Sequence, residues 1–208
     1  MKESKDGFIG IDVGLTGAIC ILDENIKPKI HKMPTIKVEN SSYKHWYNSN
    51  EIGNILNEAK EKYSNAHVFL EYQRPIPGQR IDSVFRLGRG FGLLEGIASE
   101  IFGYIDIIDP KKWQHYLYKK FLTKEDLALV EFGTDKVHLQ MDKGYGDIFE
   151  KKRSLKATKL TKLRTFYCLY KSGIIDKVPK ADLKDTDKVD SLMISYYGLL
   201  STNTGAKK

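Results

Sequence analysis

The stretch GFIGIDVGLTGAICILD, residues 7 to 23, places one aspartate, Asp12, within an otherwise apolar run. The runs 8–13 and 18–23 are typical of β-strands, and the GLTG between them is typical of a hairpin turn. Burying a carboxylate in such a strand is unfavourable unless it has a partner. That partner could be a lysine, a phosphate or a metal ion, or else the turn amides at Gly14 or Thr16.

The rest of the chain alternates strands and helices. KPKIHKMP (27–34) predicts an edge strand that Pro34 ends, whereas the residues from 35 to 50 are polar and irregular. Apolar residues at helical spacing predict helices over 50–63, 83–102, 111–118, 156–171 and 186–200. Short apolar runs predict strands over 66–72 and 104–109. Three meandering strands followed by alternating strands and helices predict an α/β fold, a mixed five-stranded sheet flanked by helices.

The length of 208 residues, 41% of them apolar, favours a single domain over 1–208. Residues 119–155 are charged and weakly periodic, and are interpreted as an insertion or a mobile arm. STNTGAKK (201–208) is expected to be a flexible tail. Cys20 and Cys168 lie in apolar surroundings and are expected to be reduced core residues.

Neither a signal peptide nor an apolar run long enough to span a bilayer is visible in the sequence. An intracellular, reducing compartment is therefore expected, with cytoplasm, nucleus and organelle all open. The 34 Lys and Arg residues outnumber the 27 Asp and Glu, for a net charge of +7. This balance favours a polyanionic partner, nucleic acid before membrane, although a lysine-rich proteome would also account for it.

Three further acids stand where structure alone would not require them. Glu71 ends the strand VFLE, and Asp187 and Asp190 share one face at the start of the last helix. Glu71 could pair with Arg74, Asp187 could be a helix-start acid and Asp190 could be solvated. Taken with Asp12, however, clustered carboxylates repel one another unless a cation lies among them. Hard oxygen ligands select Mg²⁺ or Mn²⁺, and two such ions can support phosphodiester hydrolysis.

The same acids lie within a family resemblance. IGIDVGLTGA, FLEYQRPIPGQRIDSVFRLGRGFGLLEGI, IDPKKW and DTDKVDSLMISYYG resemble, in this order, the four blocks of the RuvC-type Holliday-junction resolvases. The phage and organellar branch is the most similar, with its P-G-Q, its aromatic and glycine-rich helix and its P-x-x-W. The resemblance covers residues 7–23, 66–117 and 156–200.

The resemblance implies an RNase H-like fold and a homodimer that resolves four-way DNA junctions by paired symmetric nicks. By matched position, the catalytic residues and metal ligands would be Asp12, Glu71, Asp187 and Asp190. Two Mg²⁺ or Mn²⁺ ions per site are implied, with Asp12 bridging them and a metal-bound water as the nucleophile.

The chain departs from the family pattern near Glu71. The bacterial branch has an aromatic wedge three residues after that glutamate, where this chain has Arg74. Opening of the junction is therefore assigned to Arg74, Gln79 or Arg80. Some relatives also have a lysine where this chain has Gln114, which leaves the identity of a catalytic lysine open.

Further basic residues are candidates for DNA contact. Two of them, Lys111 and Lys112, lie just before the tryptophan of IDPKKW. Others lie largely off the apolar stripe of the helix over 156–171, namely Lys156, Lys159, Lys162 and Arg164. A solvated helix face is the alternative interpretation of this second group.

Other functions remain compatible with the sequence. The chemistry could act on flaps, forks or RNA–DNA hybrids instead of four-way junctions. A junction-binding protein without catalysis is a second alternative, although four clustered acids argue against it. The hairpin GIDVGLTGA also resembles the phosphate hairpin of actin-like kinases and ATPases, but that architecture requires two such domains.

Overall fold

The computed structural model describes residues 5–39, 44–75, 77–132, 141–142, 144–154 and 159–205. Its strands are β1 (Asp6–Asp12), β2 (Ala18–Asp23), β3 (Pro28–Lys32), β4 (Thr35–Lys37), β5 (His45–Tyr47), β6 (Asn65–Glu71) and β7 (Asp106–Ile108). Its longer helices are α1 (Ser49–Lys62), α2 (Ile81–Phe102), α3 (Pro110–Phe121), α4 (Lys124–Phe132), α6 (Tyr145–Ser154), α7 (Leu160–Lys171) and α9 (Thr186–Gly205). Two short helical segments, η1 (Ile174–Lys177) and α8 (Lys180–Leu183), lie between α7 and α9.

The main sheet has five strands in the order β3-β2-β1-β6-β7. The pairs β3–β2 and β2–β1 are antiparallel, whereas β1–β6 and β6–β7 are parallel. The prediction of a mixed five-stranded sheet flanked by helices is therefore confirmed. The predicted hairpin is also present, because Asp12 and Ala18 are paired on either side of the turn.

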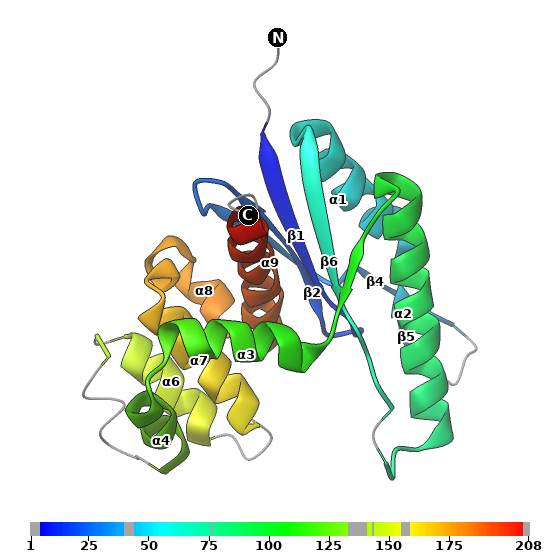
Figure 1. Ribbon diagram of the computed structural model, residues 1–208. Helices are drawn as coiled ribbons and strands as arrows, with labels where there is room; N and C mark the ends of the chain where they lie inside the picture. Colours follow the sequence, from blue (N-terminus) through cyan, green and yellow to red (C-terminus); the bar gives the residue numbers. More distant parts are fainter. Residues whose placement is uncertain are drawn as a thin grey trace.

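Helices cover both faces of the sheet, with α3, α7 and α9 on one side and α1 and α2 on the other (Figure 1). Side chains alternate between these two layers along β1, as the period of a strand requires. Phe8 packs toward α9, whereas Ile9 and Ile11 pack toward α1 and α2. Each face of the sheet thus contributes to its own core, and the central strand is buried on both sides.

Helix α9 lies unusually close to β1. A Cβ atom on Gly10 would lie 2.4 Å from the carbonyl oxygen of Ser191 and 2.5 Å from the amide nitrogen of Ser195. Only a glycine therefore permits this approach. The hydroxyl of Ser195 also donates to the carbonyl of Cys20 at 3.1 Å. This contact places the first turns of α9 beside the end of β1.

The structure differs from the sequence-based expectations in three places. Residues 35–50 include a small antiparallel hairpin, β4–β5, where an irregular segment was expected. Within 119–155 the described residues form α4 and α6, whose Val130 and Phe149 are buried in the core with α7, so this part is not a detached arm. Helix α9 continues to Gly205, beyond the predicted end at Leu200. The single-domain assignment, with 119–155 as an insertion, stays a prediction.

Cys20 and Cys168 are buried free thiols, as expected of reduced core residues. Among the described residues, no helix has the length and apolar character needed to cross a membrane.

Candidate active site

Asp12 and Glu71 are the last residues of β1 and β6. Because these neighbouring strands are parallel, their carboxyl ends lie at the same edge of the sheet. Both side chains are almost fully buried, at 7% and 9% exposure. The fold therefore brings together the two acids that the sequence placed in separate strands.

The beginning of α9 supplies two more acids to this edge. The carboxylate of Asp185 accepts a hydrogen bond from the backbone N–H of Asp187 at 3.0 Å, which caps the helix start. Asp187 and Asp190 then face the end of β1. One carboxylate oxygen from each of Asp12, Asp187 and Asp190 lies within 4.8 Å of the other two.

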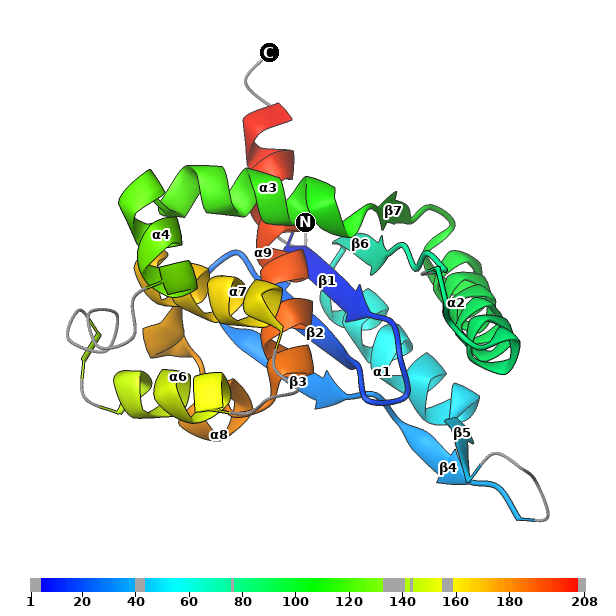
Figure 2. The same ribbon diagram turned by 90° about the horizontal axis from the view of Figure 1, so that it is seen from below.

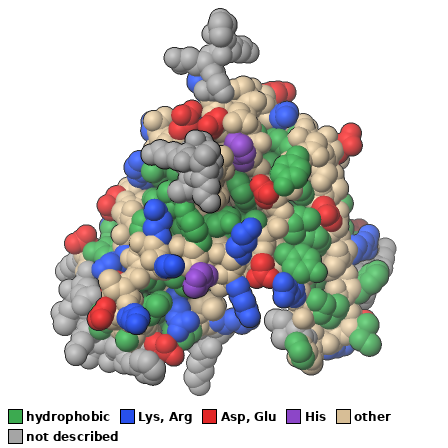
Figure 3. Space-filling view, viewed as in Figure 1, with side chains coloured by type: hydrophobic (Ala, Val, Ile, Leu, Met, Phe, Trp, Pro, Cys, Tyr) green, Lys and Arg blue, Asp and Glu red, His purple; other side chains and the backbone are tan. Residues whose placement is uncertain are grey.

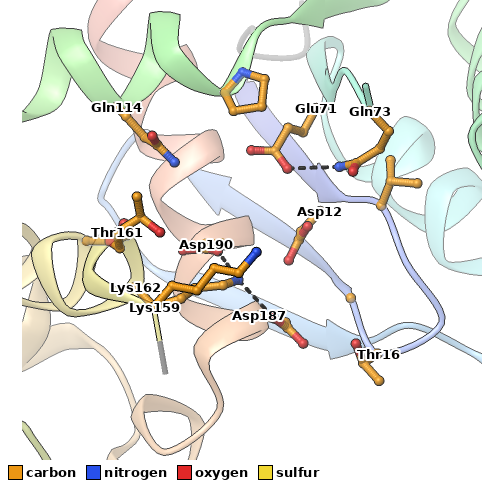
Figure 4. A pocket seen from close by; sticks show the side chains of 14 residues that line it. Asp12, Thr16, Glu71, Gln73, Gln114, Lys159, Thr161, Lys162, Asp187 and Asp190 are labelled. Atoms are coloured by element: carbon orange, nitrogen blue, oxygen red, sulfur yellow. Dashed lines mark hydrogen bonds and ion pairs between the residues drawn. The ribbon is translucent and has the colours of Figure 1, made fainter. Parts of the chain in front are cut away.

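A lysine from α7 reaches into this acidic cluster. The Nζ atom of Lys162 donates to Oδ1 of Asp187 at 2.9 Å and also contacts Oδ2 of Asp190. Figure 4 shows its side chain extending between the two aspartates. The sequence made Lys162 a candidate for DNA contact, with a solvated helix face as the alternative; in the structure its ammonium pairs with these two acids.

Glu71 stands slightly apart and is held by two donors. The indole N–H of Trp113 donates to its Oε1 at 2.8 Å, and the amide of Gln73 donates to its Oε2 at 3.0 Å. Trp113 is completely buried in α3, whose start is capped by Asp109 and has Pro110 in its first turn. This role of Trp113 was missed from the sequence, although the IDPKKW block contained the residue.

These groups surround a polar cavity of about 310 Å³ (Figure 4). It is lined by Asp12, Val13, Thr16, Gly17, Glu71, Gln73, Pro110, Gln114, Lys159, Thr161, Lys162, Thr165, Asp187 and Asp190. All four predicted acids thus open onto one cavity, although Glu71 is not part of the tight group of three.

Burial and mutual repulsion raise the pKa values of these acids. Burial, followed by the charge of Asp190, raises the pKa of Asp12 well above its ordinary value. Burial raises the pKa of Asp190 to about 6, although the charge of Lys162 opposes this shift. Burial also raises the pKa of Glu71 to about 7, although the hydrogen bond from Trp113 opposes it. Burial disfavours the charge on Lys162, but Asp190 and Asp12 outweigh it and raise the pKa of this lysine. The negative charge of the cluster is thus only partly compensated by the protein.

The donor set fits a hard divalent cation. Asp12, Asp187 and Asp190 offer three carboxylate oxygens at close range, and Mg²⁺ and Mn²⁺ prefer such ligands. A cation among them would also relieve the repulsion that raises their pKa values. The buried acidic cluster can therefore bind a metal ion.

The residues predicted to contact DNA lie around this cavity in different settings. Lys159 lines the cavity itself. Arg74 pairs with Asp109 at the start of α3, and Arg80 lies 3.8 Å from Asp82 at the start of α2. The others are placed as follows: Lys111 and Lys112 are exposed on the first turn of α3, Gln79 lines a neighbouring cavity, Arg164 donates to Glu131, and Lys156 lies outside the described residues.

Lys and Arg side chains gather over α3 and below it on the face shown in Figure 3. A polyanion reaching the acidic cavity from this side would meet positive charge at its rim. DNA contact by the individual residues stays a prediction.

A buried lysine of α6 contacts the loop that precedes α9. Lys152 is 4% exposed and donates from Nζ to the backbone carbonyl of Lys184 at 2.9 Å, just before the start of α9. Burial lowers its pKa. Lys152 therefore braces the loop that carries Asp185, just before α9, a role that the charge pattern of the sequence did not predict.

The comparison with solved structures gives a distant likeness. No protein-family model matches the chain, and no curated protein sequence matches it significantly. Among solved structures, it is similar to the yeast mitochondrial Holliday junction resolvase Ydc2, at 15% identity and a TM-score of 0.35, over 96% of this chain and 84% of that chain. At this TM-score the two folds agree only in part.

Proposed function

We propose that this protein is a metal-dependent endonuclease of RNase H-like fold that resolves four-way DNA junctions. One observation carries the proposal: three carboxylates from β1 and α9 meet at close range beside Glu71, in a cavity with basic residues at its rim. A purely structural cluster of this kind would leave repelling charges buried. The four-block resemblance to the RuvC-type resolvases supplies the substrate class.

Each residue has a distinct part in this proposal. Asp12, Asp187 and Asp190 would hold a divalent cation, with Glu71 as a further ligand at the other side of the cavity. Two Mg²⁺ or Mn²⁺ ions, when bound, supply Lewis-acid activation of water and neutralise charge on the phosphodiester. Trp113 fixes the orientation of the Glu71 carboxylate through its N–H.

Basic side chains would position the DNA backbone. Lys159 lines the cavity, and the exposed Lys111 and Lys112 lie on the first turn of α3. Arg74 and Arg80 lie in the loop between β6 and α2, where they would meet the branch point. Positive charge at these positions supplies affinity that weakens with added salt.

Symmetric nicks in a four-way junction require two active sites, and we propose a homodimer that forms through α2. The outer face of α2 exposes Ile81 and Phe85, at 86% and 63%. Farther along the helix, Gly88, Gly92 and Gly96 have open space where a Cβ would lie. Hydrophobic side chains are prominent on the right-hand part of Figure 3, which α2 occupies in Figure 1. Another helix backbone could approach this face closely.

The test is cleavage of end-labelled four-way junctions, flaps, forks, RNA–DNA hybrids and linear duplex in Mg²⁺ or Mn²⁺, with the cut sites mapped. We expect paired symmetric nicks in the junction and little cutting of linear duplex. Asp12→Asn should abolish cleavage and retain junction binding, because it removes a ligand without removing positive charge. Glu58→Gln, an exposed acid paired with Lys29 far from the cavity, is the matched control.

The panel also separates the alternatives. If flaps, forks or hybrids are cut in preference to the junction, the protein is still a metal-dependent nuclease but its substrate is not the four-way junction. If the wild-type protein binds the junction but does not cut it, the result supports the alternative of a junction-binding protein without catalysis. The kinase alternative needs two sheets of this kind, and the described residues form one five-stranded sheet and a two-stranded hairpin.

A further inference from the structure

A second cavity, of about 230 Å³, adjoins the acidic one and has no part in the chemistry described so far. Its walls come from the β1–β2 turn, from β5, from the beginning of α2 and from the loop just before α2, and they include Thr16, Trp46, Tyr47, Gln79 and Arg86. The two cavities are neighbours, because Thr16 lines both of them. In Figure 2 the β1–β2 turn lies between α9 on one side and α2 with the β4–β5 hairpin on the other. We call this second cavity the Trp46 groove.

The walls of the Trp46 groove are fixed to one another. Tyr47 is almost fully buried and lines the groove together with Gly14 of the β1–β2 turn. A Cβ on Gly90 would lie 2.6 Å from the Tyr47 ring, so the hairpin packs directly on the α2 backbone. Trp46 packs edge-on against Tyr47, with ring centroids 5.4 Å apart. A ligand would therefore enter a groove that is already formed.

The chemistry of the groove suits a flat, apolar ring attached to a negative backbone. Trp46 provides an indole, and the guanidinium of Arg89 lies 4.4 Å from its ring centroid. Arg86 adds a cation and Gln79 an amide at the same groove. Its volume is below the roughly 300–1,000 Å³ of pockets for drug-sized ligands, which favours a single ring system. Proteins that hold single-stranded nucleic acid combine aromatic rings and cations in this way.

We propose that the Trp46 groove receives one unpaired nucleobase of the DNA strand whose phosphate lies in the acidic cavity. This inference rests on the proposed nuclease function and adds a source of selectivity to it. A base in an intact duplex must be unstacked before it can enter, whereas a base at a branch point is already available. The groove thus favours cutting beside a branch point over cutting in linear DNA.

The proposal is tested by the base analogue 2-aminopurine, placed in turn at each nucleotide around the mapped cut site of a four-way junction. In the Asp12→Asn background, which prevents cutting, we expect binding to change the fluorescence at one flanking position. Adding Trp46→Ala should abolish that change and weaken junction binding about tenfold, whereas Trp46→Phe should largely retain both. Tyr104→Ala, which removes a 74% exposed aromatic residue outside the groove, is the control.

A second measurement needs no change to the protein. With 5-iodouracil at the responsive position, photocrosslinking of the wild-type protein in Ca²⁺ should attach the DNA to the peptide that contains Trp46 and Tyr47. Crosslinks confined to other peptides, or a fluorescence change that Trp46→Ala leaves intact, would overturn the groove proposal. If the wild-type protein still cuts the junction in that case, the nuclease function stands and only the groove proposal fails. If neither the wild-type protein nor the Trp46 variants with Asp12 intact cut the junction, the proposed function itself fails.

Discussion

The Nζ atom of Lys162 lies 2.9 Å from Oδ1 of Asp187. The same ammonium contacts Asp190, so one cation of the protein engages two of the three clustered acids. The carboxylates of Asp187 and Asp190 also belong to the cluster that would ligate a metal ion. Lys162 and a divalent cation therefore compete for the same negative charge, and the lysine must yield part of its contacts when a metal binds.

Replacing Lys162 by methionine removes this competitor while keeping the aliphatic stem. We expect binding of Mn²⁺ or Mg²⁺ to the DNA-free protein to tighten about tenfold, equivalent to about 1.4 kcal/mol. Isothermal titration calorimetry measures the affinity directly. Lys159→Met is the control, because Lys159 lines the same cavity from an exposed position at the start of α7. Unchanged or weaker binding by Lys162→Met would show that the lysine organises the metal ligands instead.

The hydrogen bond from Trp113 to Glu71 gives a second prediction. Trp113→Phe keeps an aromatic ring in the core but leaves the carboxylate without its indole donor. A hydrogen bond to a charged group contributes about 1.5–3 kcal/mol, so we expect single-turnover cleavage to slow at least about tenfold.

The control for Trp113→Phe must lose packing without touching Glu71. Phe149→Leu meets this condition, because Phe149 is completely buried in the same core cluster. We expect both variants to lose stability in thermal unfolding, since each removes buried volume. Only the Trp113 variant should cut slowly. Equal rates for the two variants would leave Trp113 with a packing role alone.

The parts of the site that were predictable come from local patterns. Asp12 was found because it interrupts an apolar run that is typical of a strand, and Glu71 because it ends such a run. Asp187 and Asp190 were found because their spacing places them on one face of a helix. The four acids then meet in the fold, because β1 pairs in parallel with β6 and α9 packs closely on β1.

The parts that were not predictable depend on long-range packing. Trp113 and Glu71 are 42 residues apart, and Lys162 and Asp187 are 25 apart, so no local periodicity marks either contact. The strands of the β4–β5 hairpin have three residues each, too few for an alternating pattern. Lys152 appears in the sequence as one charge among many, yet it is buried against the loop before α9.

The raised pKa of Glu71 predicts a pH-dependent cost to stability in the metal-free protein. The native pKa is about 7, against 4.5 for the free side chain, so the native state binds more protons between these values. Stability from this group is full below pH 4.5 and is lost as the pH rises through about 7. Glu71→Gln removes the charge and can still accept from Trp113.

We therefore expect Glu71→Gln to be more stable than wild type at pH 8, by up to about 3 kcal/mol, and to show no such advantage at pH 4. Urea unfolding in the presence of a chelator, repeated across this pH range, measures the difference. Glu58→Gln should give parallel curves at all pH values, because Glu58 is exposed. An advantage for Glu71→Gln that does not change with pH would contradict the assigned shift.

The outer face of α2 gives the last prediction, which concerns assembly. Gly92→Glu places a charged side chain where the proposed dimer would bring two helices together, and we expect a monomer at concentrations where the wild type is a dimer in sedimentation equilibrium. Helix instability would not explain this result, because glutamate favours helices over glycine by up to about 1 kcal/mol. Gly53→Glu on α1, also at a glycine with open space around it, should remain dimeric. The monomeric variant should also lose paired nicking, and a dimeric Gly92→Glu protein would place the interface elsewhere.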